Sequence, residues 1–164
     1  MGRAFVLGDG IDTDQLAPGI FMKLPAEELA QHCLEGLRPD FAKSVKPGDC
    51  IVAGSNFGQG SSREQAAISL KLLGVSAVFA HSFARIFYRN AINIGLPAIE
   101  IAPEVIVDEG DELAFDLAKA QLRNIAKDTT YSISALPPHL LDIIDAGGLV
   151  PLLKKQFASG HLKG

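Results

Sequence analysis

The sequence predicts an α/β fold with a central, partly parallel sheet flanked by helices and a small antiparallel β section. Residues 50–101 alternate short apolar segments with segments of helical periodicity, in the order β-α-β-α-β, which is typical of a parallel α/β unit. Residues 105–133 consist of short alternating segments between turns, which favours antiparallel strands. Because domains commonly contain about 100–200 residues, we expect one domain over the 164 residues, 1–164.

The individual elements follow from local signals. Residues 3–7 are apolar and lead into Gly8-Asp9-Gly10, which predicts a strand and a turn, and residues 11–19 then form a loop. A helix is expected to begin at Pro25 and to stop at Gly36. In the α/β unit we expect strands at 50–53, 76–80 and 97–101 and helices at 62–73 and 82–93. After it we expect strands at 105–107, 112–116, 121–125 and 130–133 and helices at 137–144 and 149–157.

The composition excludes several classes of protein. The 15 Lys and Arg residues against 19 Asp and Glu residues give a net charge of −4, whereas a nucleic-acid-binding protein normally has a basic surplus. No apolar run reaches the roughly 18 residues of a membrane-spanning helix, and the N-terminus lacks the apolar region of a secretory signal. We therefore expect a cytoplasmic protein without a nucleic-acid or membrane partner.

The chain has two cysteines, Cys33 and Cys50. Two cysteines are too few for a disulfide framework, or for an iron–sulfur cluster held by cysteines of this chain alone. His32 is adjacent to Cys33, so the two side chains point to different sides of a helix and form no metal-ligand spacing with Cys50. We expect no metal on this chain.

The most informative segment is GSNFGQGSSRE, residues 54–64, between a predicted strand and a predicted helix. Its glycines permit positive φ and close approach of a ligand. Ser61 and Glu64 have the spacing of a capping box, which predicts Ser61 as the N-cap of a helix whose free N–H groups favour an anion. Arg63 adds donors suited to a carboxylate or phosphate, and Ser62 adds a second hydroxyl.

Two known phosphate-binding loops do not fit this segment. A Walker A loop needs Gly-Lys-Ser/Thr, but no lysine precedes Ser61, and the dinucleotide fingerprint Gly-x-Gly-x-x-Gly does not occur in that order. On spacing alone, an ordinary tight turn with a capped helix stays an open alternative. For Asp12 and Asp14, ordinary turn chemistry is the favoured interpretation, because Asp bonds its own backbone in loops.

Residues 54–64, together with SFARIFYRNAINIGLP at 82–97, resemble the swivelling domain of the aconitase superfamily. Residues 8–18, with DTDQ at 12–15, and AGGL at 146–149 extend the resemblance to nearly the whole chain. The chain is similar in particular to the free-standing small subunits of the isopropylmalate-type dehydratases. This resemblance implies a swivelling β/β/α domain and a hydro-lyase that removes water from a hydroxy diacid and adds it back the other way round.

The resemblance also implies roles for individual residues. Ser61 matches the base that takes a proton from the carbon next to a carboxylate, and Arg63 matches the residue that binds a substrate carboxylate. Ser62 matches a residue that contacts the substrate or supports the serine alkoxide, and Asp14 matches an acidic active-site residue that we interpret as an orienting partner. We expect a helix N-terminus and Arg63 to lower the pKa of the Ser61 hydroxyl. The implied partner is a large subunit that holds a [4Fe-4S] cluster, with no cofactor on this chain.

The sequence departs from the family pattern at two places. Gln65 stands where many members have His, for which we expect a structural effect. Residues 19–24, GIFMKL, replace a segment that contacts the variable part of the substrate. Phe21 and its apolar neighbours suit an aliphatic group, as in isopropylmalate. Lys23 suits a further carboxylate of the substrate, and a solvated surface lysine is the alternative interpretation. We favour an aliphatic substrate; homoaconitase, 2,3-dimethylmalate dehydratase and a non-catalytic anion-binding module are the alternatives.

Overall fold

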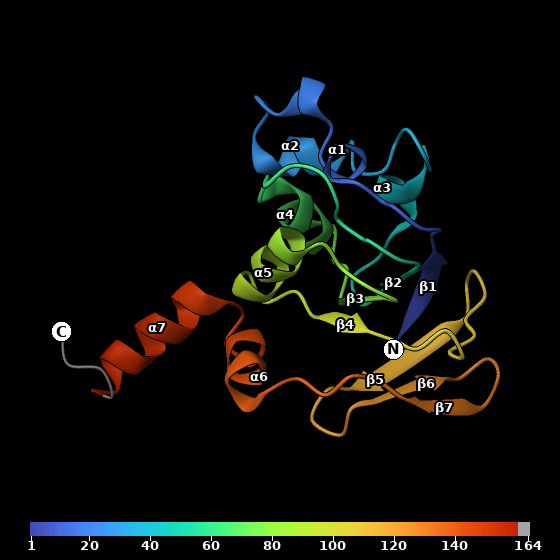
Figure 1. The fold of residues 1–164 in the computed structure, drawn as a ribbon. Helices are drawn as coiled ribbons and strands as arrows, with labels where there is room; N and C mark the ends of the chain where they lie inside the picture. The colour runs from blue at the N-terminus through green and yellow to red at the C-terminus, as the bar shows by residue number, and fades with distance from the viewer. Residues whose placement is uncertain (161–164) are drawn as a thin grey trace.

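A mixed seven-stranded sheet organises residues 1–160, the part of the chain that this computed structural model describes (Figure 1). Residues 161–164, the end of the expected domain, lie outside it. The strand order is β4-β3-β2-β1-β5-β6-β7. The strands are β1 (Gly2–Val6), β2 (Cys50–Ala53), β3 (Ala77–Ala80), β4 (Ala98–Glu100), β5 (Glu112–Asp116), β6 (Gln121–Asn124) and β7 (Thr129–Ser132).

Strand β1 joins the two halves of the sheet. It pairs in parallel with β2, with Ala4 opposite Cys50, and antiparallel with β5, with Gly2 opposite Leu113. Strands β1 to β4 are parallel to one another and β5 to β7 are antiparallel. The predicted α/β architecture, with a partly parallel sheet and an antiparallel section, is confirmed.

The helices divide into two groups. Figure 1 shows α1 to α5 on one side of the parallel strands, whereas α6 and α7 lie beyond β4 and α7 points away from the sheet. None of the helices within residues 1–160 is long and apolar enough to cross a membrane. The helices are α1 (Thr13–Leu16), the 3-10 helix η1 (Gly19–Phe21), α2 (Ala26–Ala30), α3 (Phe41–Ser44), α4 (Gln65–Leu72), α5 (Arg85–Asn93), α6 (Pro138–Asp145) and α7 (Leu149–Ala158).

Two clusters of buried side chains cover opposite faces of the sheet. Because side chains alternate along a strand, Phe5 packs into one cluster and its neighbour Ala4 into the other. Every residue of β2 and β3 is buried, as expected for central parallel strands. The antiparallel section reaches the second cluster, where the rings of Phe115 and Phe79 meet edge to face with centroids 5.5 Å apart.

The start of α4 differs from the sequence prediction. The helix begins at Gln65 with Glu64 as its N-cap, not at Ser62 after a Ser61 cap, and Glu64 makes no side-chain capping bond. The backbone N–H of Ser61 instead donates to Thr13 Oγ1 at 3.0 Å, so this residue is tied to another loop before the helix begins. The prediction of Ser61 as an N-cap is therefore wrong.

A capping box does form, but in the segment expected to be a plain loop. Asp12 Oδ1 accepts from the N–H of Gln15 at 2.8 Å, and Gln15 Oε1 accepts from the N–H of Asp12 at 2.9 Å. These reciprocal bonds start α1. The helix beginning near Pro25 ends at Ala30 rather than Gly36, because the N–H groups that follow donate three residues back instead of four. These turns stop at Leu34, which has a φ of 60° and whose N–H donates to Gln15 O. Residues 105–107 form no strand.

The turn between α6 and α7 packs closely on the end of α5. Gly95 has a φ of 80°, and a Cβ there would lie 2.6 Å from the carbonyl carbon of Gly147. Gly110 has a similar φ of 84°, but a Cβ there would have no heavy atom within 4 Å. The two glycines therefore share the conformational requirement, and Gly95 alone also has the close approach.

We predict that Gly110→Ala lowers the free energy of unfolding by about 1–2 kcal/mol, the cost of a left-handed backbone for an L-residue. Gly95→Ala should cost about 1–3 kcal/mol more because the methyl group overlaps Gly147. Urea unfolding followed by circular dichroism measures both. Equal losses in the two variants would contradict the close packing of this turn.

Candidate active site

The loops that follow β1 and β2 run side by side at the carboxyl ends of the parallel strands, where ligands of open α/β sheets bind. Hydrogen bonds continue the pairing of the two strands into these loops. They join Gly54 N to Gly8 O (3.1 Å), Gly10 N to Ser55 O (2.8 Å), Gly58 N to Ile11 O (2.6 Å) and Thr13 N to Gln59 O (2.8 Å). The ladder brings the DTDQ segment at 12–15 beside the SSR segment at 61–63.

Ser61 lies at the end of this ladder and is exposed. Its Oγ is 3.1 Å from Thr13 Oγ1, and its N–H donates to the same oxygen. Thr13 is only 3% exposed. Gly60 has a φ of 111°, and a Cβ there would lie 3.0 Å from Thr13 Oγ1, so the loop requires glycine next to Ser61.

Arg63 is fixed by the neighbouring loop. Its Nη1 donates to Asp14 Oδ1 at 3.1 Å and to Ala17 O at 2.8 Å. Among the described residues, no hydrogen bond occupies its Nη2 or Nε atoms, and none joins Arg63 to Ser61. The guanidinium is therefore held at one nitrogen while three N–H donors stay available for a planar anion.

Asp14 holds this arginine without being buried. Its side chain is 70% exposed, and Oδ1 also accepts from the N–H of Gly19 at 2.8 Å. The Gly19 N–H, and after it the Arg63 guanidinium, hold the pKa of the Asp14 carboxyl below its ordinary value. Asp14 therefore stays ionised at neutral pH and links Arg63 to the start of the 19–24 segment.

The predicted substrate contacts in the 19–24 segment lie in different surroundings. Phe21 is half-buried and stacks on His32, with ring centroids 3.6 Å apart, and Lys23 is exposed. Ile20 is 86% exposed, whereas its apolar neighbours in the segment pack against the core. Ser62 is also exposed, and its carbonyl accepts from Asn90 Nδ2 at 3.4 Å. The structure thus brings Ser61, Arg63 and Asp14 together and leaves Ile20 as the apolar side chain available to a ligand.

The mechanism expected to activate Ser61 needs correction. Since α4 begins four residues later, Ser61 is not at a helix tip, and Arg63 contacts Asp14 and Ala17 instead of the serine. The group that does touch Ser61 Oγ is Thr13, which the sequence analysis missed. Its place between two aspartates in DTDQ was the available signal, but nothing in the sequence showed that this threonine is buried.

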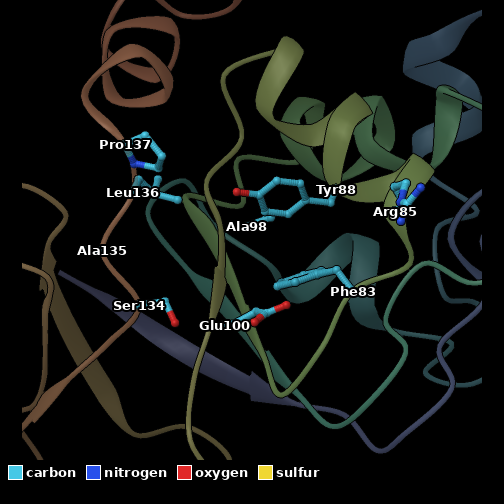
Figure 2. Close-up of a pocket in the computed structure, with 9 residues that line it drawn as sticks. All are labelled: Phe83, Arg85, Tyr88, Ala98, Glu100, Ser134, Ala135, Leu136 and Pro137. Carbon is cyan, nitrogen blue, oxygen red and sulfur yellow. The ribbon is translucent and has the colours of Figure 1, made fainter.

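A pocket of about 320 Å³ lies along β4, between the start of α5 and residues 134–137 (Figure 2). The rings of Phe83 and Tyr88 lie over it, with Glu100 below Phe83. Burial and the charge of Glu100 raise the pKa of Tyr88. No predicted site residue lines this pocket, so it is separate from the Ser61 surface.

The cysteines do not fit an iron–sulfur cluster. Both are buried, Cys33 after α2 and Cys50 in β2, and burial raises the pKa of each thiol. Cluster ligands are thiolates, which such an environment disfavours. Within residues 1–160, no three His, Cys, Asp or Glu side chains are grouped to hold a metal ion.

Known proteins share both sequence and fold with this chain. The Aconitase C-terminal domain family matches residues 37–104. The methanogen homoaconitase small subunit of Methanothermobacter thermautotrophicus is 49% identical, over 97% of this chain and 93% of that protein. The 3-isopropylmalate dehydratase small subunit of Methanosarcina acetivorans is 50% identical, over 94% of this chain and 96% of that protein. A crystal structure of 3-isopropylmalate dehydratase from Methanocaldococcus jannaschii is 46% identical with a TM-score of 0.92, over 99% of this chain and 98% of that one.

The fold and these similarities define a small subunit of the aconitase-superfamily hydro-lyases. The chain belongs to the 3-isopropylmalate dehydratase small-subunit family, among whose relatives is a homoaconitase small subunit. The resemblance expected from residues 54–64 and 82–97 is confirmed. The roles of the individual site residues stay predictions.

We predict that the Asp14 carboxyl titrates below 3.8 in a carboxyl-detected NMR titration of the folded chain. Because the folded-state pKa is lowered, its contribution to stability is complete above the unfolded-state pKa and is lost as the pH falls through the folded-state value. Arg63→Gln should raise the Asp14 pKa only partly, since the Gly19 N–H is the larger cause. Titration of Asp14 at 3.8 or above in the parent would contradict the observed contacts.

Proposed function

We propose that this chain is the small subunit of a two-chain hydro-lyase that interconverts 2-isopropylmalate and 3-isopropylmalate. The observation that carries the proposal is one exposed hydroxyl, Ser61, in a fixed loop beside a guanidinium with free donors, Arg63. Such a surface offers a candidate base beside a candidate carboxylate-binding group. Relatives named as dehydratase small subunits support it.

In this reaction Ser61 takes the proton from the carbon next to a substrate carboxylate. The C–H electron pair forms a double bond to the neighbouring carbon as hydroxide leaves that carbon, and water then adds back with the two positions exchanged. Charge that develops at the carboxylate is stabilised by Arg63, whose Nη2 and Nε donors match a planar anion. Asp14 keeps the guanidinium in position, and Ser62 adds a substrate contact.

The second half of the site comes from a large subunit. The aconitase resemblance assigns a [4Fe-4S] cluster to that partner, where it would bind the hydroxyl that leaves. The exposure of Ser61 supports this arrangement, because a proton transfer from carbon needs a site from which water is excluded. We also propose that the two-chain enzyme is cytoplasmic.

The substrate side chain meets the 19–24 segment. Ile20 presents an apolar surface close to Gly19, which is hydrogen-bonded to Asp14, so an isopropyl group of a substrate bound to Arg63 would reach it. Phe21 is stacked on His32 and packed against the core, and it anchors this segment. A tricarboxylate is the second candidate, since one relative is a homoaconitase small subunit and Lys23 is exposed for a further carboxylate.

We predict that Ser61→Ala lowers kcat by about 10²–10⁴-fold in the complex reconstituted with a cluster-loaded large subunit, the usual contribution of a general base. Steady-state kinetics with 3-isopropylmalate measure this loss, and the chain without the large subunit should give no turnover. Ser132→Ala, on the exposed face of β7, is the matched control. Near-parental turnover by Ser61→Ala would remove the serine from the base role.

We predict that Ile20→Ala lowers kcat/KM for 3-isopropylmalate by about 10–100-fold, because lost apolar contacts of this size weaken discrimination by that order. Ile106→Ala, which also removes an exposed isoleucine, is the control. A panel of branched malates and tricarboxylates distinguishes the two substrate classes. If tricarboxylates are preferred and Lys23→Ala abolishes that preference, the second candidate replaces the first.

A further inference from the structure

We propose that Thr13 is the positioning residue of the reaction: its hydroxyl donates a hydrogen bond to Ser61 Oγ and so holds that oxygen as a proton acceptor. The inference rests on the proposed role of Ser61 as the base. It replaces the helix tip and the arginine that the sequence analysis expected at this oxygen, neither of which contacts it.

The loss of the Ser61 proton fixes the direction of this hydrogen bond. A threonine hydroxyl has one hydrogen to donate and two lone pairs to accept with. One lone pair of Thr13 Oγ1 takes the backbone N–H of Ser61 at 3.0 Å, and Ser61 Oγ lies 3.1 Å from the same oxygen. Once Ser61 has lost its proton, its oxygen can only accept, so Thr13 is the donor in the reactive form.

The surroundings hold the Thr13 hydroxyl in this place. Thr13 is 3% exposed, its N–H donates to Gln59 O at 2.8 Å, and it is the first residue of α1, inside the capping box formed by Asp12 and Gln15. A β-branched side chain in a helix also has restricted χ1. Gly60 leaves just enough room for Oγ1. Thr13 is therefore buried and fixed, while the serine it contacts is exposed to a ligand.

Among the described residues, no other hydrogen bond reaches Ser61 Oγ. Both hydrogens of Arg63 Nη1 are used by Asp14 and Ala17. A hydrogen bond to the charged form of a group favours that form, and the effect is larger where water is excluded, as it would be under a partner subunit. The hydrogen-bond donor that lets Ser61 act as a base is thus Thr13, at the start of α1.

A thiol at position 61 tests this hydrogen bond without any turnover. In the Ser61→Cys chain, the pH dependence of iodoacetamide alkylation gives the thiol pKa, and the parent chain gives the background of the buried Cys33 and Cys50. Adding Thr13→Val, which keeps the shape but removes the donor, should raise that pKa by about one unit or more. Adding Thr13→Ser should leave it unchanged. Equal values with Thr13→Val and Thr13→Ser would overturn the inference.

The reconstituted complex tests the consequence for the reaction. Thr13→Val should lower kcat at least about tenfold with KM nearly unchanged, and it should move the rising limb of the kcat/KM pH profile to higher pH, while Thr13→Ser restores both. A merely structural role would leave the profile in place. Thr13→Ala serves the same purpose if Thr13→Val does not fold, as judged by circular dichroism.

The two proposals fail differently in this experiment. If Ser61→Ala is nearly as active as the parent, the serine base is wrong, and the role of Thr13 is overturned with it. If Ser61→Ala is inactive but Thr13→Val keeps the parental kcat and pH profile, the base stands and only the positioning role is overturned. Loss of kcat with a displaced profile, restored by Thr13→Ser, supports both.

Discussion

The parallel pairing of β1 with β2 is the constraint on which the site depends. The hydrogen-bond ladder does not stop where the strands end but continues through the two following loops as far as Thr13 and Ser61. Two segments about 50 residues apart in the chain are thereby held in one register. An exposed loop that would otherwise sample many conformations is fixed before any ligand binds, which is the preorganisation that a catalytic base requires.

The second constraint is the ionic contact between Asp14 and Arg63. Exposed ion pairs contribute little to stability, so the contact acts mainly by orienting Arg63. Because Asp14 also accepts from Gly19, the same carboxylate connects Arg63 to the segment with Ile20. In the proposed function, the group that binds a substrate carboxylate is thus joined directly to the segment that meets the variable part of the substrate.

The distribution of burial agrees with a chain that works as half of an enzyme. Ser61, Ser62, Asp14 and Ile20 are all exposed, whereas Thr13, which contacts Ser61, is buried. Cys33 and Cys50, in contrast, are buried in the core. This distribution fits the proposed role, in which a partner subunit removes hydroxide.

The sequence by itself determined the α/β class and most strand positions, because local periodicity is read from neighbouring residues. It also named Ser61, Arg63 and Asp14 as candidate site residues, whose roles stay predictions. It misplaced the start of α4 and assigned the capping box to Ser61 instead of Asp12, since Ser-x-x-Glu spacing does not show whether an N–H is already used elsewhere. Only the tertiary structure decided that Thr13 lies within hydrogen-bond distance of Ser61 and that the Ile20 side chain is exposed whereas Phe21 is half-buried. These contacts join residues far apart in the chain, and their energies depend on burial, which a linear pattern does not contain.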